Sequence, residues 1–131
     1  MKPTHPVELL ACAIATQEGW FAASGSNQPQ LKNNPGDIRY AKQLNASAPE
    51  WNGIGNPPIA TFSNPATGIA GLYRQLWMQV AEGQTVAEII AQWAPPVQNQ
   101  TTLYLRNVLA WTGLPRDTPV LDLLPPLISL S

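Results

Sequence analysis

One glutamate in this 131-residue sequence has the surroundings of a general acid, a group that donates a proton during bond cleavage. Glu18 ends an apolar run that is typical of a helix. Within about 40° of it around the helix axis lie Val7, Ala11 and Ile14. A lone glutamate at a helix end is commonly a solvated surface residue, but here the carboxyl faces the core. Burial and the negative end of the helix dipole both disfavour its charged form, so the pattern predicts an acid that keeps its proton.

The composition indicates one folded domain and argues against several classes of partner. The 14 prolines and 9 glycines separate apolar periodic segments, which is typical of structured turns. A net charge of −1 without a basic run argues against nucleic acid. With a single cysteine and a single histidine, no internal disulfide, metal or other cofactor is expected. No segment has the length of a membrane span, so we expect no membrane insertion, and we expect a monomer.

Hydrophobic periodicity and capping residues predict four helices. They run from Pro6 to Gln17 or Glu18, from Pro65 to Gly83 after a cap at Ser63 or Asn64, from Thr85 to Trp93, and from about Asn99 to Gly113. One more helical turn after Asp117 is expected to place Val120, Leu121 and Leu124 on the core.

The segment between the first two predicted helices has strand and turn patterns instead. Residues 21–29 and 41–57 are predicted as loops. Pro35 and Gly36 form a turn pair, and residues 38–40 alternate as in a short strand that pairs with residues 59–62. The predicted fold class is α+β, mainly α, in one domain spanning residues 1–131. Glu18 would lie where the hairpin meets the helices, the natural place for a cleft.

Four stretches of this sequence resemble motifs of a known superfamily, over roughly residues 8–118. They are Asn33–Arg39, Ala60–Ser63 with Gly68 and Ile69, Thr85–Ile90 with Trp93–Pro96, and Asn99–Thr101 with Tyr104. A glutamate ending the first helix, then a hairpin, then a helical lobe is similar to the lysozyme-like plan. Goose-type lysozymes, soluble lytic transglycosylases and phage endolysins share that plan. The motifs themselves look like those of phage and prophage lysozyme-like proteins.

The resemblance implies cleavage of peptidoglycan glycan strands at the β-1,4 bond between N-acetylmuramic acid and N-acetylglucosamine. Glu18 matches the general acid, which protonates the leaving glycosidic oxygen. Asp37 on the hairpin is the candidate for a second carboxylate, and Glu50 on the loop is a weaker one. Aspartate is also common after Pro-Gly in turns, so Asp37 has a structural explanation as well. A lytic transglycosylase needs only one carboxylate, so muramidase and transglycosylase both stay open.

Substrate contacts are expected from aromatic and amide side chains. Trp20, beside Glu18, and Trp51, in a polar loop, are candidates to stack on sugar rings. Three further tryptophans lie on the apolar faces of predicted helices and are expected in the core: Trp77, Trp93 and Trp111.

The resemblance also supplies polar candidates for substrate binding. Asn34 belongs to the first matched motif. Asn99, Thr101 and Tyr104 belong to the last one, which would face the glutamate, and Asn99 also suits a helix cap. Tyr104 would hydrogen-bond Glu18 or the sugar. Arg39 would pair with Asp37 or Glu18 and lower the pKa of its partner.

Two other functions compete with the glycosidase. One is a catalytically silent lysozyme-like module that binds cell wall or belongs to a virion, because a fold alone does not establish an activity. The other is a helical adaptor or DNA-binding domain, which the scarcity of basic residues disfavours. No signal peptide is predicted, because Pro6 and Glu8 interrupt the apolar stretch before Cys12. The expected site of action is the periplasm or cell wall, reached by phage delivery.

Overall fold

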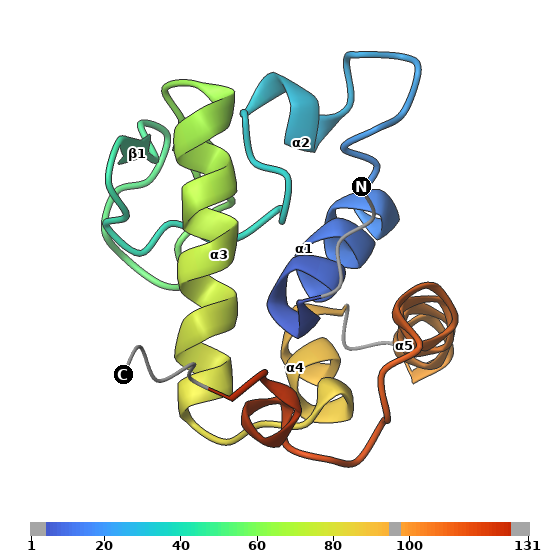
Figure 1. Cartoon of the computed structure of the whole chain (residues 1–131). Coiled ribbons are helices and arrows are strands. Elements are labelled where there is room, and N and C mark those ends of the chain that lie inside the picture. Colours follow the sequence, from blue (N-terminus) through green and yellow to red (C-terminus); the bar gives the residue numbers. More distant parts are fainter. Residues whose placement is uncertain (1–4, 95–97, 127–131) are drawn as a thin grey trace, which may run out of the picture.

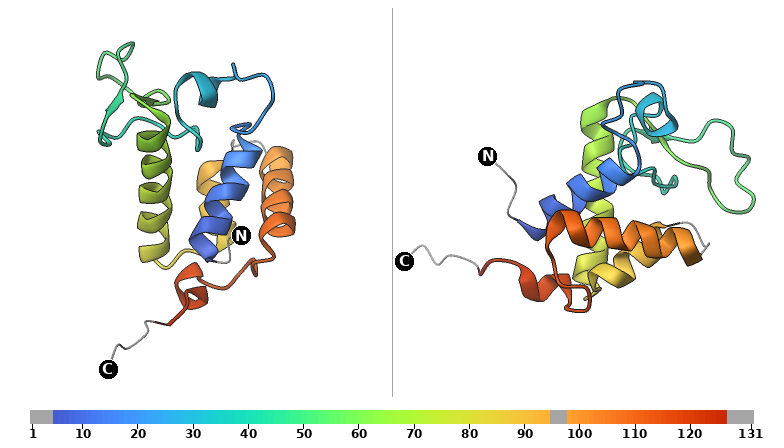
Figure 2. Two further views of the ribbon diagram at one scale, coloured as in Figure 1. Left: turned by 45° about the horizontal axis from the view of Figure 1, so that its top comes forward. Right: turned by 90° about the vertical axis from the view of Figure 1, so that its right-hand side faces the viewer.

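The first helix, α1 (Pro6–Gln17), lies between two other helices of the chain, as the views in Figures 1 and 2 show. The computed structural model describes residues 5–94 and 98–126. His5 caps α1, since its Nδ1 accepts a hydrogen bond from the backbone N–H of Val7 at 3.2 Å. Pro6 occupies the first turn, where its missing N–H removes no helical hydrogen bond. The predicted start and end of this helix are confirmed.

Side-chain hydrogen bonds cap the start of several of the remaining helices. Their bounds are Gln28–Leu31 for α2, Pro65–Ala81 for α3, Val86–Trp93 for α4 and Gln98–Thr112 for α5, and a 3-10 helix, η1, spans Val120–Leu123. Asn64 caps α3 by accepting from the N–H of Thr67. Thr85 and Glu88 form the predicted capping box of α4. The predicted helical turn after Asp117 is present as η1, and it places Val120 and Leu124 on the core, but the same expectation for Leu121 is wrong because that side chain is 50 % exposed.

The main hydrophobic core forms where α1 packs against α3 and α5, and α4 packs against α5. Its fully buried side chains include Leu10, Ile14, Leu76, Ile90 and Val108. Figure 1 shows α3 and α5 on opposite sides of α1, which therefore contributes side chains to both contacts. The C-terminal end of α1, which carries Glu18, thus lies against the core.

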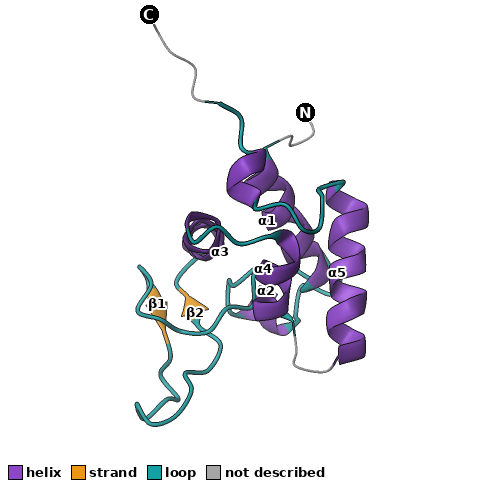
Figure 3. Cartoon of the chain, turned by 90° about the horizontal axis from the view of Figure 1, so that it is seen from below, coloured by secondary structure: helices purple, strands orange, loops and turns teal. Residues whose placement is uncertain are grey.

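A small two-stranded sheet lies beside α3, as Figure 3 shows from below. Strand β1 (Ala46–Ser47) pairs antiparallel with β2 (Thr61–Phe62), Ala46 opposite Phe62. The structure corrects the predicted hairpin, because residues 38–40 contribute only a single bridge, Arg39 to Ile59. The partner of β2 comes instead from the segment predicted as loop. The segment between α2 and α3, residues 32–64, is called the small lobe below. Phe62 is buried together with Ile38 and Ala60, and this second cluster is the core of the small lobe.

Helix α2 was not predicted. Asn27 and Gln30 form a capping box around it, so one turn of helix ends the segment that was predicted as loop. The prediction of an α+β fold that is mainly helical is confirmed. Among the described residues, no helix combines the length and the apolar character needed to cross a membrane.

Candidate active site

Glu18 is the C-cap residue of α1. Its backbone N–H donates to the carbonyl of Ile14 at 2.9 Å, and Gly19 then takes a left-handed conformation at φ +88°. This conformation suits glycine, and it ends the helix directly after the glutamate. The carbonyl of Gly19 accepts from the side-chain amide of Asn27 at 2.7 Å. The chain therefore turns sharply at Glu18 and leaves its half-buried side chain facing the region between the helices and the small lobe.

Tyr104 on α5 donates a hydrogen bond from its hydroxyl to Oε2 of Glu18 at 2.7 Å. The two residues are 86 positions apart, and the packing of α1 against α5 brings them together. Tyr104 is 4 % exposed, so its ring is fixed by the surrounding core. The hydrogen bond predicted for this tyrosine is present, and it fixes the orientation of the glutamate carboxyl.

Burial raises the pKa of Glu18 to about 7. Desolvation of the charged form is the largest cause. The hydrogen bond from Tyr104 acts in the opposite direction, and the negative charge of Asp37 raises the pKa further. The pKa of Tyr104 is also raised, first by burial and then by Glu18, so the tyrosine stays a hydrogen-bond donor. Near neutral pH, about half of the Glu18 carboxyls carry the proton that a general acid must supply.

Asp37 lies on a turn built by a buried asparagine. Asn34 is fully buried; its Oδ1 accepts from the N–H of Ile38, and its Nδ2 donates to the carbonyls of Ile38 and Ala60. The backbone of Asp37 adopts φ +50°, a left-handed conformation that Asp and Asn tolerate better than most residues. The turn therefore presents the Asp37 side chain at a fixed place beside Glu18 in the cleft.

The carboxyl of Asp37 is half-buried, and its pKa is raised by desolvation, while the charges of Lys32 and Arg39 act to lower it. Its buried Oδ1 accepts no hydrogen bond from any residue that the structure describes. Within the described ranges Arg39 forms no ion pair with a carboxylate, so that part of the prediction is wrong, whereas its charge does act to lower the pKa of Asp37 as expected. The Arg39 guanidinium instead donates to the carbonyl of Pro57 at 2.7 Å.

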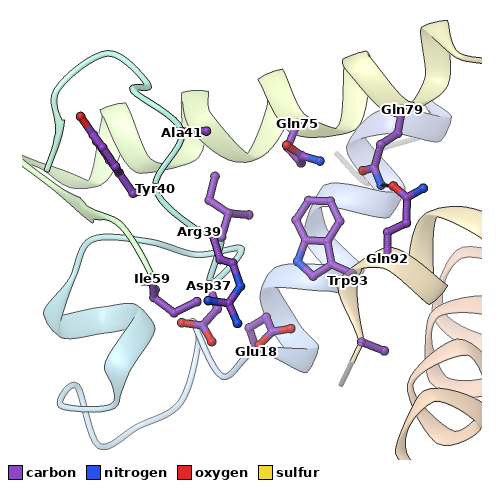
Figure 4. Close-up of a pocket in the computed structure, with 12 residues that line it drawn as sticks. Glu18, Asp37, Arg39, Tyr40, Ala41, Ile59, Gln75, Gln79, Gln92 and Trp93 are labelled. Carbon is purple, nitrogen blue, oxygen red and sulfur yellow. Dashed lines mark hydrogen bonds between the residues drawn. The ribbon is translucent and has the colours of Figure 1, made fainter. Parts of the chain in front are cut away.

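Glu18 and Asp37 line one cleft of about 570 Å³ (Figure 4). The small lobe contributes one wall through Ile38, Arg39, Tyr40, Ala41 and Ile59. The other wall comes from α3 and α4 and the residue after α4, through Gln75, Gln79, Gln92, Trp93 and Ala94. The indole Nε1 of Trp93 donates to the carbonyl of Gly36 at 2.7 Å, which links the end of α4 to the turn that carries Asp37. Two carboxyls and several hydrogen-bonding side chains thus share one cleft.

Several residues predicted to bind substrate lie elsewhere. Asn34 is corrected to a structural role, since a fully buried side chain with its hydrogen bonds made to backbone cannot touch a ligand in the cleft. Trp20 packs partly buried against the main core and does not line the cleft. Thr101 lines a separate hollow between α4 and α5. The side chain of Asn99 lies outside the described part of the chain.

Trp51 and Glu50 lie on the long loop of the small lobe. The indole of Trp51 donates to the carbonyl of Ile54, and its ring meets the edge of Tyr40, which does line the cleft. Glu50 forms an ion pair with Lys32 at 3.7 Å and is not among the residues around Glu18, so the structure removes it as a second carboxylate.

The prediction that three helical tryptophans lie in the core is only partly right. Trp77 and Trp111 are 43 % and 50 % exposed, so the prediction is wrong for both. Trp93 packs against both hydrophobic clusters and also lines the cleft.

Sequence reasoning missed the three glutamines of the cleft, Gln75, Gln79 and Gln92. A signal existed for Gln79, since it lies three residues after Leu76 and beside Val80, on the buried side of α3. A polar residue at a core position of an amphipathic helix is a candidate for a site. The described residues include no group of three His, Cys, Asp or Glu side chains arranged to hold a metal ion.

No protein-family model, curated protein or solved structure matches this chain. The site therefore has to be interpreted from its own geometry and chemistry.

Proposed function

We propose that this protein is a peptidoglycan-cleaving glycosidase with Glu18 as its general acid. The observation that carries the proposal is a half-buried carboxyl with a pKa of about 7 that opens into a cleft and is oriented by Tyr104. A glycosidic oxygen is a poor leaving group until it is protonated, and an acid of this kind supplies the proton. The motif resemblance to lysozyme-like proteins supports the β-1,4 bond between N-acetylmuramic acid and N-acetylglucosamine as the target.

In this proposal the proton moves from Glu18 to the bridging oxygen as the bond from that oxygen to the anomeric carbon breaks. Positive charge then develops on the sugar ring. Asp37 is the group in the cleft that can stabilise this charge or guide the attack of water, because its buried Oδ1 has no partner among the described residues. Hydrolysis through both carboxyls is therefore the favoured route. In the transglycosylase route, the sugar's own acetamido and 6-hydroxyl groups would replace Asp37.

The test is clearing of purified cell walls, followed by turbidity and by zymogram. Wild type is expected to clear the suspension, and Glu18→Gln is expected to lose at least about 100-fold in rate, since the amide has no acidic proton to give. Glu8→Gln is the matched control, because Glu8 is an exposed glutamate on the same helix. Circular dichroism checks that all three proteins fold.

Clearing by Glu18→Gln at the wild-type rate would refute the assignment of the acid. Wall binding by wild type without any clearing would instead identify the protein as a catalytically silent wall-binding module. Mass spectrometry of the released fragments separates the two enzymatic routes: reducing ends identify a hydrolase, and 1,6-anhydro ends identify a lytic transglycosylase.

A further inference from the structure

Three glutamine side chains gather at the end of the cleft formed by α3 and α4. Gln75 and Gln79 lie one turn apart on α3, and Gln92 lies on α4. In Figure 4, Gln79 and Gln92 point toward one another, and Trp93 lies between this pair and the two carboxyls. The amide nitrogen of Gln79 donates to the amide oxygen of Gln92 at 2.8 Å. The mechanism proposed above uses none of these amides.

Gln79 occupies a position where an apolar side chain would ordinarily be more stable. It is 2 % exposed, and its neighbours Leu76 and Val80 are fully buried. Its Oε1 is buried and accepts no hydrogen bond from any residue in the described ranges. A buried acceptor without a donor is unfavourable, so the folded state gains nothing from this oxygen. A polar group that faces a cleft at such a disadvantage is suited to a ligand that supplies the missing donor.

We propose that Gln79, with Gln75 and Gln92, forms a subsite that binds a secondary amide of the ligand. The exposed Gln92 side chain first turns aside, and the ligand N–H then donates a hydrogen bond to Oε1 of Gln79. The side-chain amides of Gln75 and Gln92 supply N–H donors for the ligand carbonyl. The Trp93 ring, held by its bond to Gly36, gives the apolar part of that group a surface to pack on. The choice of ligand class rests on the proposed function.

Two parts of peptidoglycan carry secondary amides: the acetamido groups of its sugars and the bonds of its stem peptides. Both offer the same N–H and C=O pair, so the subsite chemistry is shared and the choice of probes must separate the sources. Chitohexaose carries acetamido groups and no peptide, whereas a free stem peptide carries amides and no sugar. Cellohexaose has the same β-1,4 linkage as chitohexaose and no amide.

Dissociation constants for the three probes are measured by calorimetry with the full chain carrying Glu18→Gln, which prevents cleavage during the measurement. This protein is expected to bind chitohexaose or the stem peptide about tenfold more tightly than cellohexaose, and Gln79→Met is expected to remove that preference. Preference for chitohexaose assigns the subsite to the sugar, and preference for the peptide assigns it to the stem.

Gln84→Met is the matched control. Gln84 is likewise buried with an Oε1 that lacks a partner among the described residues, but it does not line the cleft. The control is expected to leave all three dissociation constants unchanged. Gln79→Met is expected to unfold at the same temperature as its parent or at a higher one, because an apolar group replaces an unsatisfied acceptor. Gln92→Ala, an exposed change that leaves the core intact, is expected to weaken amide binding as well.

Equal binding of all probes by the parent would overturn the subsite. So would unchanged amide binding in Gln79→Met, an equal loss in Gln84→Met, or a lower unfolding temperature for Gln79→Met, which would identify a structural amide. These measurements require no catalysis. If wild type fails to clear walls while the amide preference depends on Gln79, the proposed function fails and the subsite stands; the reverse pattern refutes the subsite alone.

Discussion

Glu18 loses its proton at a higher pH than a solvated glutamate because the effect of burial outweighs the hydrogen bond that it accepts from Tyr104. That hydrogen bond favours the charged carboxylate and lowers the pKa from the value that burial alone would set. The acid must be protonated to act, so activity is expected to fall as the pH rises through about 7. Two neighbouring groups therefore tune the pH range of the proposed activity, and each can be removed separately.

Tyr104→Phe is expected to move the alkaline fall of activity to higher pH. The change removes a hydroxyl that stabilises the Glu18 carboxylate, so the pKa of the glutamate rises further. The maximal rate is also expected to fall, by about tenfold, because the carboxyl loses its orientation. A pH–rate profile of kcat/KM measures both effects. A lower rate with an unmoved profile would indicate that the tyrosine acts on structure alone.

Asp37→Asn is expected to move the same limb in the opposite direction. Loss of the negative charge at Asp37 removes a cause of the raised Glu18 pKa, so the glutamate loses its proton at lower pH. Asparagine tolerates the left-handed backbone at this position, so the turn is preserved. If Asp37 stabilises the transition state, the rate falls by about 100-fold. Unchanged rates at the pH optimum would remove Asp37 from the mechanism and favour the transglycosylase route.

At the scale of elements, Gly68 in the first turn of α3 packs directly against the backbone that leads to the Asp37 turn. A Cβ at this position would overlap the carbonyl oxygen of Asn33, and the turn that carries Asp37 begins directly after Asn33. A backbone carbonyl cannot move aside as a flexible side chain can. The small lobe is therefore positioned against α3 by the absence of a side chain.

Gly68→Ala is expected to lower the free energy of unfolding by about 3 kcal/mol, as for an overpacked core. Activity is expected to fall together with stability, because the turn at Asp37 must shift. Urea unfolding of the variant measures the change, and Ala70→Ser, an exposed substitution on the same helix, is the control. A loss no larger than that of the control would show that the lobes can separate without cost at this contact.

Helix ends could be predicted from the sequence because caps are local. Pro6, Asn64 with Pro65, and Thr85 with Glu88 each act within one helical turn of their own position. The pairing of β2 could not be predicted in the same way. Its partner lies in a loop of mixed composition, and strands of two residues carry no period to recognise. Helix α2 is a single turn and was not predicted, because Asn27 and Gln30 lie within a polar run that is typical of a loop.

Across the whole molecule, the raised pKa of Glu18 links the proposed catalysis to stability. The pKa rises from its ordinary value of 4.5 in a solvated chain to about 7 in the folded protein, so the folded state holds the proton more tightly. This contribution to stability is fully present below pH 4.5 and is lost as the pH rises through about 7. The charge that the mechanism has to avoid is thus also unfavourable for the fold.

Glu18→Gln is expected to unfold at a higher temperature than wild type at pH 8, because the amide removes a buried charge. The difference is expected to shrink or reverse at pH 4, where the wild-type carboxyl is protonated in both states. Thermal unfolding followed by circular dichroism at the two pH values measures it, and Glu8→Gln serves as the exposed control. A stability difference that does not depend on pH would contradict the raised pKa.

The sequence was enough to predict that Glu18 ends its helix with a partly buried side chain, because helical periodicity places a residue relative to its own helix. It was not enough to assemble the cleft, since Tyr104, Trp93 and the glutamines approach through contacts between helices far apart in the chain. The prediction that Trp77 and Trp111 lie in the core was wrong for a related reason. Periodicity gives the direction of a side chain around its helix but not how far the neighbouring helix extends to cover it.

The hydrogen bond from the indole of Trp93 to the carbonyl of Gly36 has a consequence for motion. It crosses between the helical wall of the cleft and the turn beneath Asp37, so these walls cannot separate there while it is intact. Widening at this point requires the indole N–H to lose its acceptor and meet water. Hydrogen exchange of the Trp93 indole proton with solvent therefore reports on opening of the cleft at this point. The exchange rate sets an upper limit on how often a bulky polymer can enter by separation of the walls.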